Sequence, residues 1–214
     1  MFILNKTNSI ANNFLAELRD KSIQKDRLRF RQNLKRLGAL LAYEISKDLN
    51  YESKVIQTSL AETSTAVISD DVVIVSILRA AIPFSNGFVQ MFDNAEVGFI
   101  GAARQESNGD EVQVDLDYAA APDLTGKTLI IVDPMLATGK SLVQSVERLV
   151  KNGNPKSTHL ASVIAAPEGI AYLNESLRLN FKIWTCALDE RLNEQSYIIP
   201  GLGDAGDLAF GPKL

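Results

Sequence analysis

One segment of this 214-residue chain combines residue types that suit the binding of a phosphate. The apolar run Thr128–Val132 reads as a buried strand and is followed by Asp133 and a loop of small residues that leads into a helix-like stretch. Gly139 lets the backbone approach a ligand, and the first N–H groups of the helix, with the hydroxyls of Thr138 and Ser141, can donate to an anion. We therefore predict an anion site in this loop, with an ordinary strand-to-helix turn as the alternative.

Two phosphate ligands compete for the loop. Gly139, Lys140 and Ser141 complete a Walker A pattern, but Pro134 stands where that pattern needs its first glycine, and proline has no N–H to offer. This disfavours a nucleoside triphosphate. Asp133 favours a phosphoribosyl group, because a carboxylate at the end of a strand can accept hydrogen bonds from the ribose hydroxyls while the loop holds the 5′-phosphate.

A second glycine-rich segment, Gly201-Leu202-Gly203-Asp204-Ala205-Gly206, matches the pattern of dinucleotide-binding loops. That pattern must open the helix of a strand-helix-strand unit of about 30 residues, and the chain ends soon after Gly206. We therefore expect the three glycines to bring a loop backbone close to a flat ligand, whose polar edge would meet N–H and C=O groups.

The composition excludes other kinds of chemistry. The chain has one cysteine, Cys186, and one histidine, His159, so it can form neither a histidine-based triad nor a His/Cys metal cluster, and we expect both residues to be buried and structural. The longest run without a charged side chain covers residues 80–92, too short for the ~20 apolar residues that span a bilayer. The start of the chain lacks a secretory signal pattern, so we expect a cytoplasmic protein and no membrane partner.

A basic stretch near the start of the chain could suggest a nucleic-acid surface. Its residues are Arg19, Lys21, Lys25, Arg27, Arg29, Arg31, Lys35 and Arg36. Arg27, Arg31 and Lys35 lie four apart, as on the solvated face of an amphipathic helix, and the formal net charge of the whole chain is −4. We therefore do not expect a nucleic-acid partner.

The pattern of apolar residues predicts one α/β domain that positions these segments. Helical periodicity runs from residue 8 to about residue 49, and apolar, β-branched runs then alternate with helix-like stretches, which indicates a mainly parallel sheet flanked by helices. Ligands bind at the carboxyl ends of such strands. Residues 105–127 read as a long excursion, a β-arm or a flap over that edge. We predict strands at 72–78, 96–104, 128–132, 160–165 and 181–188 and helices at 83–92, 140–151 and 167–177.

Over nearly its whole length the sequence resembles the uracil phosphoribosyltransferases. Four motifs carry the resemblance: Ile77-Leu78-Arg79-Ala80, Asp133-Pro134-Met135-Leu136-Ala137-Thr138-Gly139, Ala165-Ala166-Pro167-Glu168-Gly169-Ile170 and Tyr197-Ile198-Ile199-Pro200-Gly201-Leu202-Gly203-Asp204-Ala205-Gly206-Asp207. The last motif distinguishes this family from other phosphoribosyltransferases. The resemblance implies the type I phosphoribosyltransferase fold in a single domain, residues 1–214, with a small hood built from a helical N-terminal part (about 1–50) and a uracil-binding C-terminal segment (about 190–214).

The resemblance also implies an activity, the transfer of ribose 5-phosphate from PRPP to N1 of uracil with Mg2+ present, giving UMP and pyrophosphate. The ribose and 5′-phosphate would be held by Asp133, Pro134, Met135, Leu136, Ala137, Thr138, Gly139, Lys140 and Ser141. Arg79 and Arg104 would face the pyrophosphate, and Ile198, Gly203, Asp204 and Ala205 would read uracil. Asp204 would also lie against PRPP or the shell of its Mg2+, and no protein group is expected to bind the metal directly. We assign no general acid or base. GTP as an effector and a homodimer or larger oligomer are expected from the family alone.

The sequence departs from the family pattern mainly on the pyrophosphate side. Ala81 and Pro83 replace two glycines, and Lys140 replaces the second glycine of the phosphate loop. Ala81 would disfavour a positive φ, Pro83 removes a donor, and Lys140 could add a cation to the phosphate site. A second hypothesis is therefore a catalytically weakened regulator of the same fold that senses uracil nucleotides and contacts RNA through residues 19–36.

Overall fold

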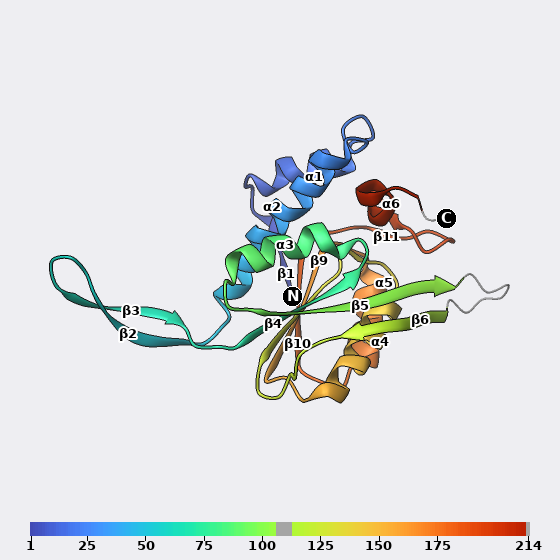
Figure 1. Cartoon of the computed structure of the whole chain (residues 1–214). Coiled ribbons are helices and arrows are strands. Elements are labelled where there is room, and N and C mark those ends of the chain that lie inside the picture. The colour runs from blue at the N-terminus through green and yellow to red at the C-terminus, as the bar shows by residue number, and fades with distance from the viewer. Residues whose placement is uncertain (106–112, 213–214) are drawn as a thin grey trace.

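The structure of the chain, a computed structural model, describes residues 1–105 and 113–212, without the side chains of residues 102–105 and 113–117. Its centre is an eight-stranded sheet in the order β1-β10-β9-β7-β4-β5-β6, with β8 beside β9 (Figure 1). Within the described residues, neighbouring strands pair in parallel except β5 and β6. The strands are β1 (Phe2–Ile3), β4 (Val72–Leu78), β5 (Glu96–Gln105), β6 (Gln113–Ala120), β7 (Thr128–Val132), β8 (Met135–Leu136), β9 (Ser157–Ala165) and β10 (Phe181–Leu188).

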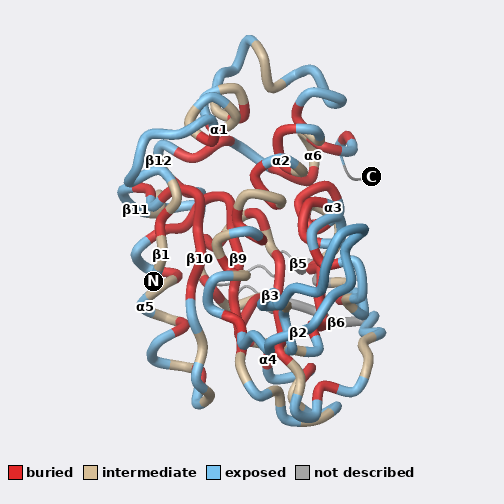
Figure 2. The backbone as a smooth tube through the Cα atoms, turned by 90° about the vertical axis from the view of Figure 1, so that its left-hand side faces the viewer, coloured by how far each residue is buried: buried red, intermediate tan, exposed pale blue. Residues whose placement is uncertain are grey.

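The sheet is covered on both faces, as the continuous apolar runs of its strands predict. Along β4, Val72 and Ile74 join a core with the N-terminal helices, while Val73 and Val75 join a second core with helices from the C-terminal half. Figure 2 shows the buried central strands enclosed by more exposed outer segments. The prediction of a mainly parallel α/β sheet flanked by helices is confirmed.

Five helices form the two outer layers. On one side α2 (Arg27–Ser46) and α3 (Ala81–Met91) pack on the sheet and α1 (Ala11–Arg19) packs on α2, while α4 (Lys140–Leu149) and α5 (Pro167–Ser176) cover the other side. Two 3-10 turns, η1 (Leu4–Lys6) and η2 (Val150–Asn152), complete these layers. None of the described helices is both long and apolar enough to span a membrane.

The predicted helical stretch from residue 8 to 49 is two helices rather than one. Asp26 begins α2 by accepting the backbone N–H of Arg29 with its Oδ1 at 3.0 Å. Aspartate is one of the residues favoured at this position, because its carboxylate satisfies a helix N–H that has no partner within the helix. The chain therefore turns between α1 and α2, which lets the two helices pack against each other.

The C-terminal segment, residues 190–212, meets the N-terminal helices. It contains β11 (Arg191–Leu192), β12 (Ile198–Ile199) and α6 (Ala205–Phe210). The two strands pair with each other in antiparallel fashion, and α6 packs on α2. In Figure 1 this segment lies beside α1 and α2, on the side of the sheet where β5 ends.

A long hairpin, which the apolar pattern does not predict, projects from the domain (Figure 1). β2 (Tyr51–Gln57) and β3 (Glu62–Ile68) pair from Tyr51 opposite Ile68 to Gln57 opposite Glu62. Nearly every residue of both strands is exposed, so neither face is buried and no hydrophobic alternation marks the strands. We call residues 51–68 the arm.

Residues 105–127, predicted as a β-arm or a flap, agree in part with the β-arm. Residues 113–120 form β6, an edge strand that pairs in antiparallel fashion with β5, and residues 106–112 lie outside the described residues. Other boundaries shift by a few positions: β9 begins at 157 rather than 160, and α3 at 81 rather than 83.

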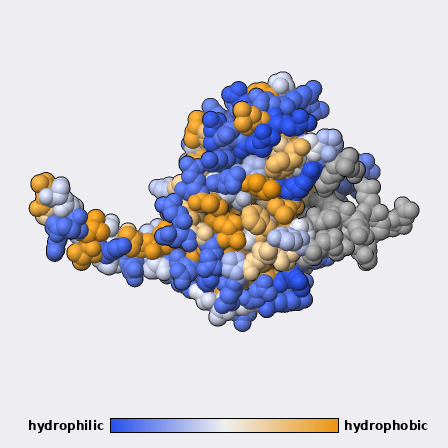
Figure 3. All heavy atoms as spheres, viewed as in Figure 1, coloured by the Kyte–Doolittle hydropathy of each residue, from blue (hydrophilic) through white to orange (hydrophobic). Residues whose placement is uncertain are grey.

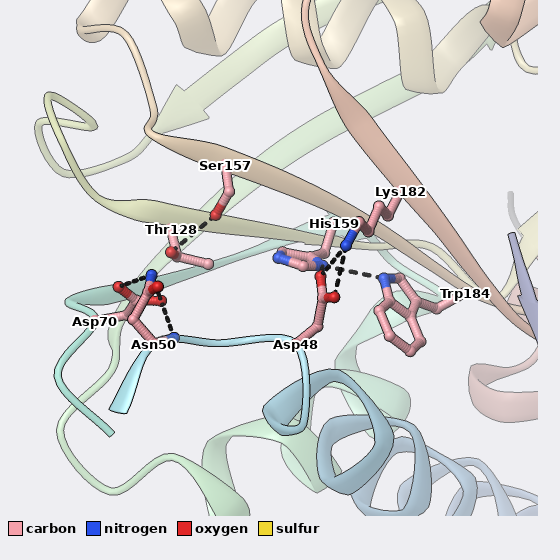
Figure 4. Close-up of polar contacts among 8 residues, drawn as sticks. All are labelled: Asp48, Asn50, Asp70, Thr128, Ser157, His159, Lys182 and Trp184. Carbon is pink, nitrogen blue, oxygen red and sulfur yellow. Dashed lines mark hydrogen bonds and ion pairs between the residues drawn. The ribbon is translucent and has the colours of Figure 1, made fainter. Parts of the chain in front are cut away.

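His159 is buried at the amino-terminal edge of the sheet, where β9 and β10 begin (Figure 4). The indole N–H of Trp184 donates to His159 Nδ1 at 3.0 Å, and Asp48 lies 4.0 Å from the same nitrogen and is held by Lys182 at 2.5 Å. Burial lowers the pKa of His159 to about 4, outweighing the attraction of Asp48. Cys186 is fully buried as well, and burial raises the pKa of its thiol. Both residues are buried, as the sequence analysis expects.

We expect acid to destabilise the folded chain through His159. Its pKa is lowered from 6.5 to about 4, so the unfolded chain binds more protons between these values, and the stabilisation present above pH 6.5 is lost as the pH falls toward 4. The full shift corresponds to about 3 kcal/mol. Urea unfolding at about pH 7.5 and about pH 5, followed by the fluorescence of the single tryptophan, measures the loss. His159→Gln keeps an acceptor for Trp184 and should show a smaller loss; equal losses in both proteins would contradict the assignment.

Candidate active site

The loop between β7 and α4, residues 133–139, is fixed on β9 at its start. The N–H of Asp133 donates to Ala161 at 3.0 Å, and the carbonyl of Pro134 accepts from Val163 at 3.0 Å and Ile164 at 3.1 Å. The carbonyl of Pro134 thus anchors the start of the loop to β9. The second half of the loop leads into the amino end of α4, where first-turn N–H groups have no partner within the helix.

Gly139 ends this loop in a conformation that suits glycine. Its φ is +78°, and it stands directly before α4. Next to it, the hydroxyl of Thr138 accepts the N–H of Lys140 at 3.4 Å, which fixes the threonine at the helix start. The predicted anion-binding geometry, a glycine-containing turn at a helix amino end, is therefore present.

A second glycine shapes the loop from outside. Gly169, in the first turn of α5, lies so close to the loop that a Cβ on it would stand 2.2 Å from the carbonyl oxygen of Ala137. The N–H of Ala166 donates to the carbonyl of Leu136 at 2.9 Å from the same side. The start of α5 therefore supports the loop directly, a role that the sequence analysis did not assign to the Ala165–Ile170 motif.

Arg79 follows the last residue of β4 and points toward the C-terminal segment. Its Nη2 donates to Asp207 at 3.4 Å and to the carbonyl of Gly211 at 3.2 Å. Its Nε is buried and has no partner among the described residues. A guanidinium has five N–H donors, so Arg79 keeps donors for an anion in the cleft while Asp207 and Gly211 orient it.

Asp204 stands at the start of α6. Its Oδ1 accepts the N–H of Asp207 at 2.9 Å, which caps the helix. Gly203 before it has a φ of +92°, a conformation that favours glycine. The loop backbone and the Asp204 carboxylate are therefore held together by the short helix that follows.

These segments surround one cleft at the carboxyl ends of the strands. It is lined by Ile77, Leu78, Arg79, Ala80, Asp133, Met135, Ala137, Ser141, Ser196, Tyr197, Asp204, Ala205 and Gly206. A smaller pocket adjoins it and shares Asp133, Met135, Ala137 and Ser141 with it, and Leu136, Thr138 and Gly139 also line that pocket. The strand end, the loop and the C-terminal segment thus meet in one place, as the parallel topology predicts.

Most of the predicted site residues therefore come together, but four of them line neither pocket and the side chain of a fifth is not described. Pro134 and Lys140 line neither pocket, and neither do Ile198, which is buried, and Gly203. The side chain of Arg104 lies outside the described residues, although its backbone is in β5 opposite Val114.

The structure adds residues to which the sequence analysis assigned no individual role. Ser196 and Tyr197 line the cleft, and Ser196 has a φ of +62°, which is uncommon for a residue other than glycine. Glu168 accepts the backbone N–H of Leu192 at 2.9 Å, and this hydrogen bond lowers the pKa of its carboxyl. Glu168 thus links α5 to the C-terminal segment. Its place in a quoted motif is the one sequence signal for this role.

Ala81 and Pro83, which depart from the family pattern, fit the local structure. α3 begins at Ala81, so Pro83 lies in the first turn, where a helix N–H has no intrahelical partner to lose. Neither residue has a positive φ, and both side chains are buried beside the core rather than in the cleft. The turn that faces the cleft is residues 77–80 instead.

We expect Ala81→Gly to lower stability without raising activity. The substitution removes a fully buried methyl group and adds backbone freedom at the start of α3, which should cost about 1 kcal/mol. Because Ala81 does not line the cleft, kcat and the KM for PRPP should stay within about twofold of the unsubstituted protein. Urea unfolding and initial rates at varied PRPP test this. A several-fold gain in kcat/KM would instead show that the alanine obstructs the cleft.

Comparison with known proteins connects this chain to a family. Residues 5–212 match the sequence profile of the family described as Uracil phosphoribosyltransferase. A uracil phosphoribosyltransferase of Porphyromonas gingivalis is 45% identical over 211 residues, which cover 99% of this chain and 98% of that protein. One of Pyrococcus furiosus is 42% identical over 203 residues, covering 94% of this chain and 85% of that protein.

A solved structure supports the fold at nearly full length. A protein of Aquifex aeolicus, 34% identical, superposes with a TM-score of 0.87 and covers 99% of this chain and 98% of that chain. The aligned range takes in nearly the whole chain, so the two proteins share one overall fold.

Proposed function

The chain belongs to the uracil phosphoribosyltransferase family, and we propose that its cleft is where it transfers the 5-phosphoribosyl group of PRPP to uracil. The enzyme gives UMP and pyrophosphate, a pyrimidine-salvage reaction. One observation supports this use of the cleft: Asp133 at the loop before α4, Asp204 before α6 and Arg79 after β4 line the same space. We also propose that residues 1–50 and 190–214 act as a hood over it and that the enzyme works in the cytoplasm.

In this proposal the phosphoribosyl group and the uracil base occupy different parts of the cleft. The loop at the amino end of α4 holds the 5′-phosphate, and the Asp133 carboxylate accepts hydrogen bonds from the ribose hydroxyls. N1 of uracil forms a bond to C1′ as the bond from C1′ to the pyrophosphate oxygen breaks; the pyrophosphate leaves with the electron pair of that bond, and the N1 proton is released to solvent. Arg79, together with Arg104, neutralises the departing pyrophosphate, and the C-terminal loop orients the base.

We propose that Mg2+ enters on PRPP. Among the described residues no three His, Cys, Asp or Glu side chains form a group that could hold a metal ion. The cleft nevertheless has the carboxylates of Asp133 and Asp204, and Mg2+ prefers oxygen ligands while keeping several waters. Bound through substrate oxygens near Asp204, the ion would neutralise charge on the pyrophosphate.

The regulator hypothesis is not favoured. Ala81 and Pro83, which motivated it, occupy buried positions in the first turn of α3 and leave the cleft-facing turn intact. The basic stretch between residues 19 and 36 also has contacts within the chain: Arg29 pairs with Glu17 at 2.8 Å, and Arg31 donates to the carbonyl of Ala209 at 2.7 Å. An RNA surface would need these side chains to be free for phosphates.

We further propose that the enzyme is a homodimer or a larger homo-oligomer. Exposed apolar side chains follow the arm and the neighbouring face of α3 and β5, as Figure 3 shows. They are Val55, Ile56, Leu60 and Ile68 on the arm and Ile82, Val89, Met91, Val97 and Phe99 beside it. Apolar surface of this extent is typical of protein contacts, and light scattering of the purified chain tests it directly.

The activity is tested by measuring UMP formation from uracil and PRPP with Mg2+. Cytosine, guanine and hypoxanthine serve as control bases, and the assay is repeated with GTP, which the family resemblance predicts as an effector. Formation of a nucleotide from uracil but from none of the control bases supports the proposal. No turnover by a folded protein that still binds uracil or UMP would favour the regulator hypothesis.

A further inference from the structure

The loop that carries Gly201 and Gly203 holds an unusual backbone shape. Gly201 has a φ of +65°, and a Cβ on it would stand 2.2 Å from the carbonyl oxygen of Ile198. The loop leaves the β11–β12 ladder after Ile199 and enters α6 at Ala205, so its backbone groups in between have no strand partner. Such a loop needs side chains from elsewhere to fix it.

Asp189 and Arg19 supply those contacts to Gly201. Asp189 directly follows β10 and has a side chain only 4% exposed; its Oδ2 accepts the N–H of Gly201 at 2.9 Å. Arg19, the last residue of α1, donates to both Asp189 oxygens, at 2.9 and 2.6 Å, and to the carbonyl of Gly201 at 3.0 Å. Both backbone groups of Gly201 are therefore bound by one bidentate ion pair.

A neighbouring residue extends this support along the loop. The amide of Gln24 donates to the carbonyl of Leu202 at 3.1 Å and to the carbonyl of Leu18 at 2.9 Å. It thereby joins the end of α1 to the residue after Gly201. Arg19 at the end of α1 and Gln24 after it, both within the stretch read from the sequence as a solvated basic face, thus bind two consecutive carbonyls of the loop.

We propose that Arg19 and Asp189 are positioning residues that set the loop for uracil, an assignment that rests on the proposed function. A base read by backbone N–H and C=O groups is sensitive to small shifts, because misplacement by about 1 Å can cost about 100-fold in rate. Arg19 and Asp189 act through Gly201 on Gly203, Asp204 and Ala205. They do not line the cleft and do not contact the phosphate loop.

Separate KM values for uracil and for PRPP distinguish a positioning role from a general effect on stability. A loss of folding would reduce the active fraction and leave both KM values unchanged. A displaced loop instead raises the KM for uracil while the KM for PRPP stays near its starting value, because the loop before α4 rests on β9 and α5 rather than on Arg19.

The experiment compares Arg19→Ala, Arg19→Lys and Gln24→Ala with the unsubstituted enzyme. Arg29→Ala is the matched control, since Arg29 lies in the same basic stretch, pairs with Glu17 at the surface and, among the described residues, makes no hydrogen bond or ion pair with the loop. We expect Arg19→Ala to raise the KM for uracil about tenfold or more, with the KM for PRPP within about twofold. Arg19→Lys keeps the charge but loses the paired donors of the guanidinium, so its KM for uracil should lie between those of the unsubstituted enzyme and Arg19→Ala. Gln24→Ala should raise the KM for uracil severalfold.

Two results would overturn the inference. One is an unchanged KM for uracil in both Arg19→Lys and Gln24→Ala, measured on soluble protein. These two variants keep the test valid if Arg19→Ala does not fold. The other is an equal rise of both KM values in the variants but not in Arg29→Ala. The unsubstituted enzyme separates this inference from the function on which it rests: without UMP formation there, the proposed function fails, whereas normal turnover with unchanged variants refutes the positioning role alone.

Discussion

Asp204→Ala is expected to lower kcat/KM for uracil by at least about 100-fold while the free energy of unfolding falls by only about 1 kcal/mol. The stability loss has a local cause, because Asp204 caps α6 by accepting the N–H of Asp207 at 2.9 Å. The larger loss comes from removing a carboxylate from the cleft that also contains Asp133 and Arg79. Initial rates at varied uracil and PRPP, with urea unfolding of the same samples, measure both effects.

Two further variants separate the cap from the cleft. Asp204→Asn keeps a side chain that caps helices well, so its stability should match the unsubstituted protein while its activity stays low. Asp26→Ala removes an equivalent cap from α2, where Asp26 accepts the N–H of Arg29 at 3.0 Å, and should lose stability without losing uracil affinity. Full activity in Asp204→Asn would show that Asp204 caps α6 and that its charge is not needed for the substrate.

The loop before α4 could be predicted from sequence because its signals are local. A buried strand, Asp133, small residues and Gly139 follow one another directly, and each has one favoured place in a strand-to-helix turn. The structure places Asp133 directly after β7 and Gly139 directly before α4, as predicted, with Gly139 at a φ of +78°. The sheet was predictable for the same reason, since continuous apolar runs indicate strands that are covered on both faces.

The arm and the support of the C-terminal loop could not be predicted in this way. The arm has no buried face, so its apolar residues do not alternate with polar ones. Arg19 and Asp189 are 170 positions apart, and only the assembled fold brings them together at Gly201. The basic stretch includes Arg19, but the spacing of its residues also fits a solvated helix face, so nothing in the sequence assigns Arg19 a contact with the loop.

Gly169→Ala is expected to impair the use of PRPP strongly. The new Cβ would stand 2.2 Å from the carbonyl oxygen of Ala137 and 3.2 Å from Leu136 Cδ1. Backbone cannot yield as a flexible side chain can, so either α5 or the loop before α4 must move. We expect kcat/KM for PRPP to fall at least about 100-fold, because the loop would no longer match the 5′-phosphate.

Gly126→Ala is the matched control for this substitution. Gly126 has a positive φ of +72°, unlike Gly169, and nothing lies within 4 Å of a Cβ placed there, so alanine should cost about 1 kcal/mol of backbone strain and leave the cleft unchanged. If Gly169→Ala acted only through stability, the two variants would show the same kinetics once the folded fraction is equal. A raised KM for PRPP in Gly169→Ala alone would place α5 among the elements that shape the phosphate site, whereas an unchanged KM would mean that α5 moves away and the loop keeps its shape without it.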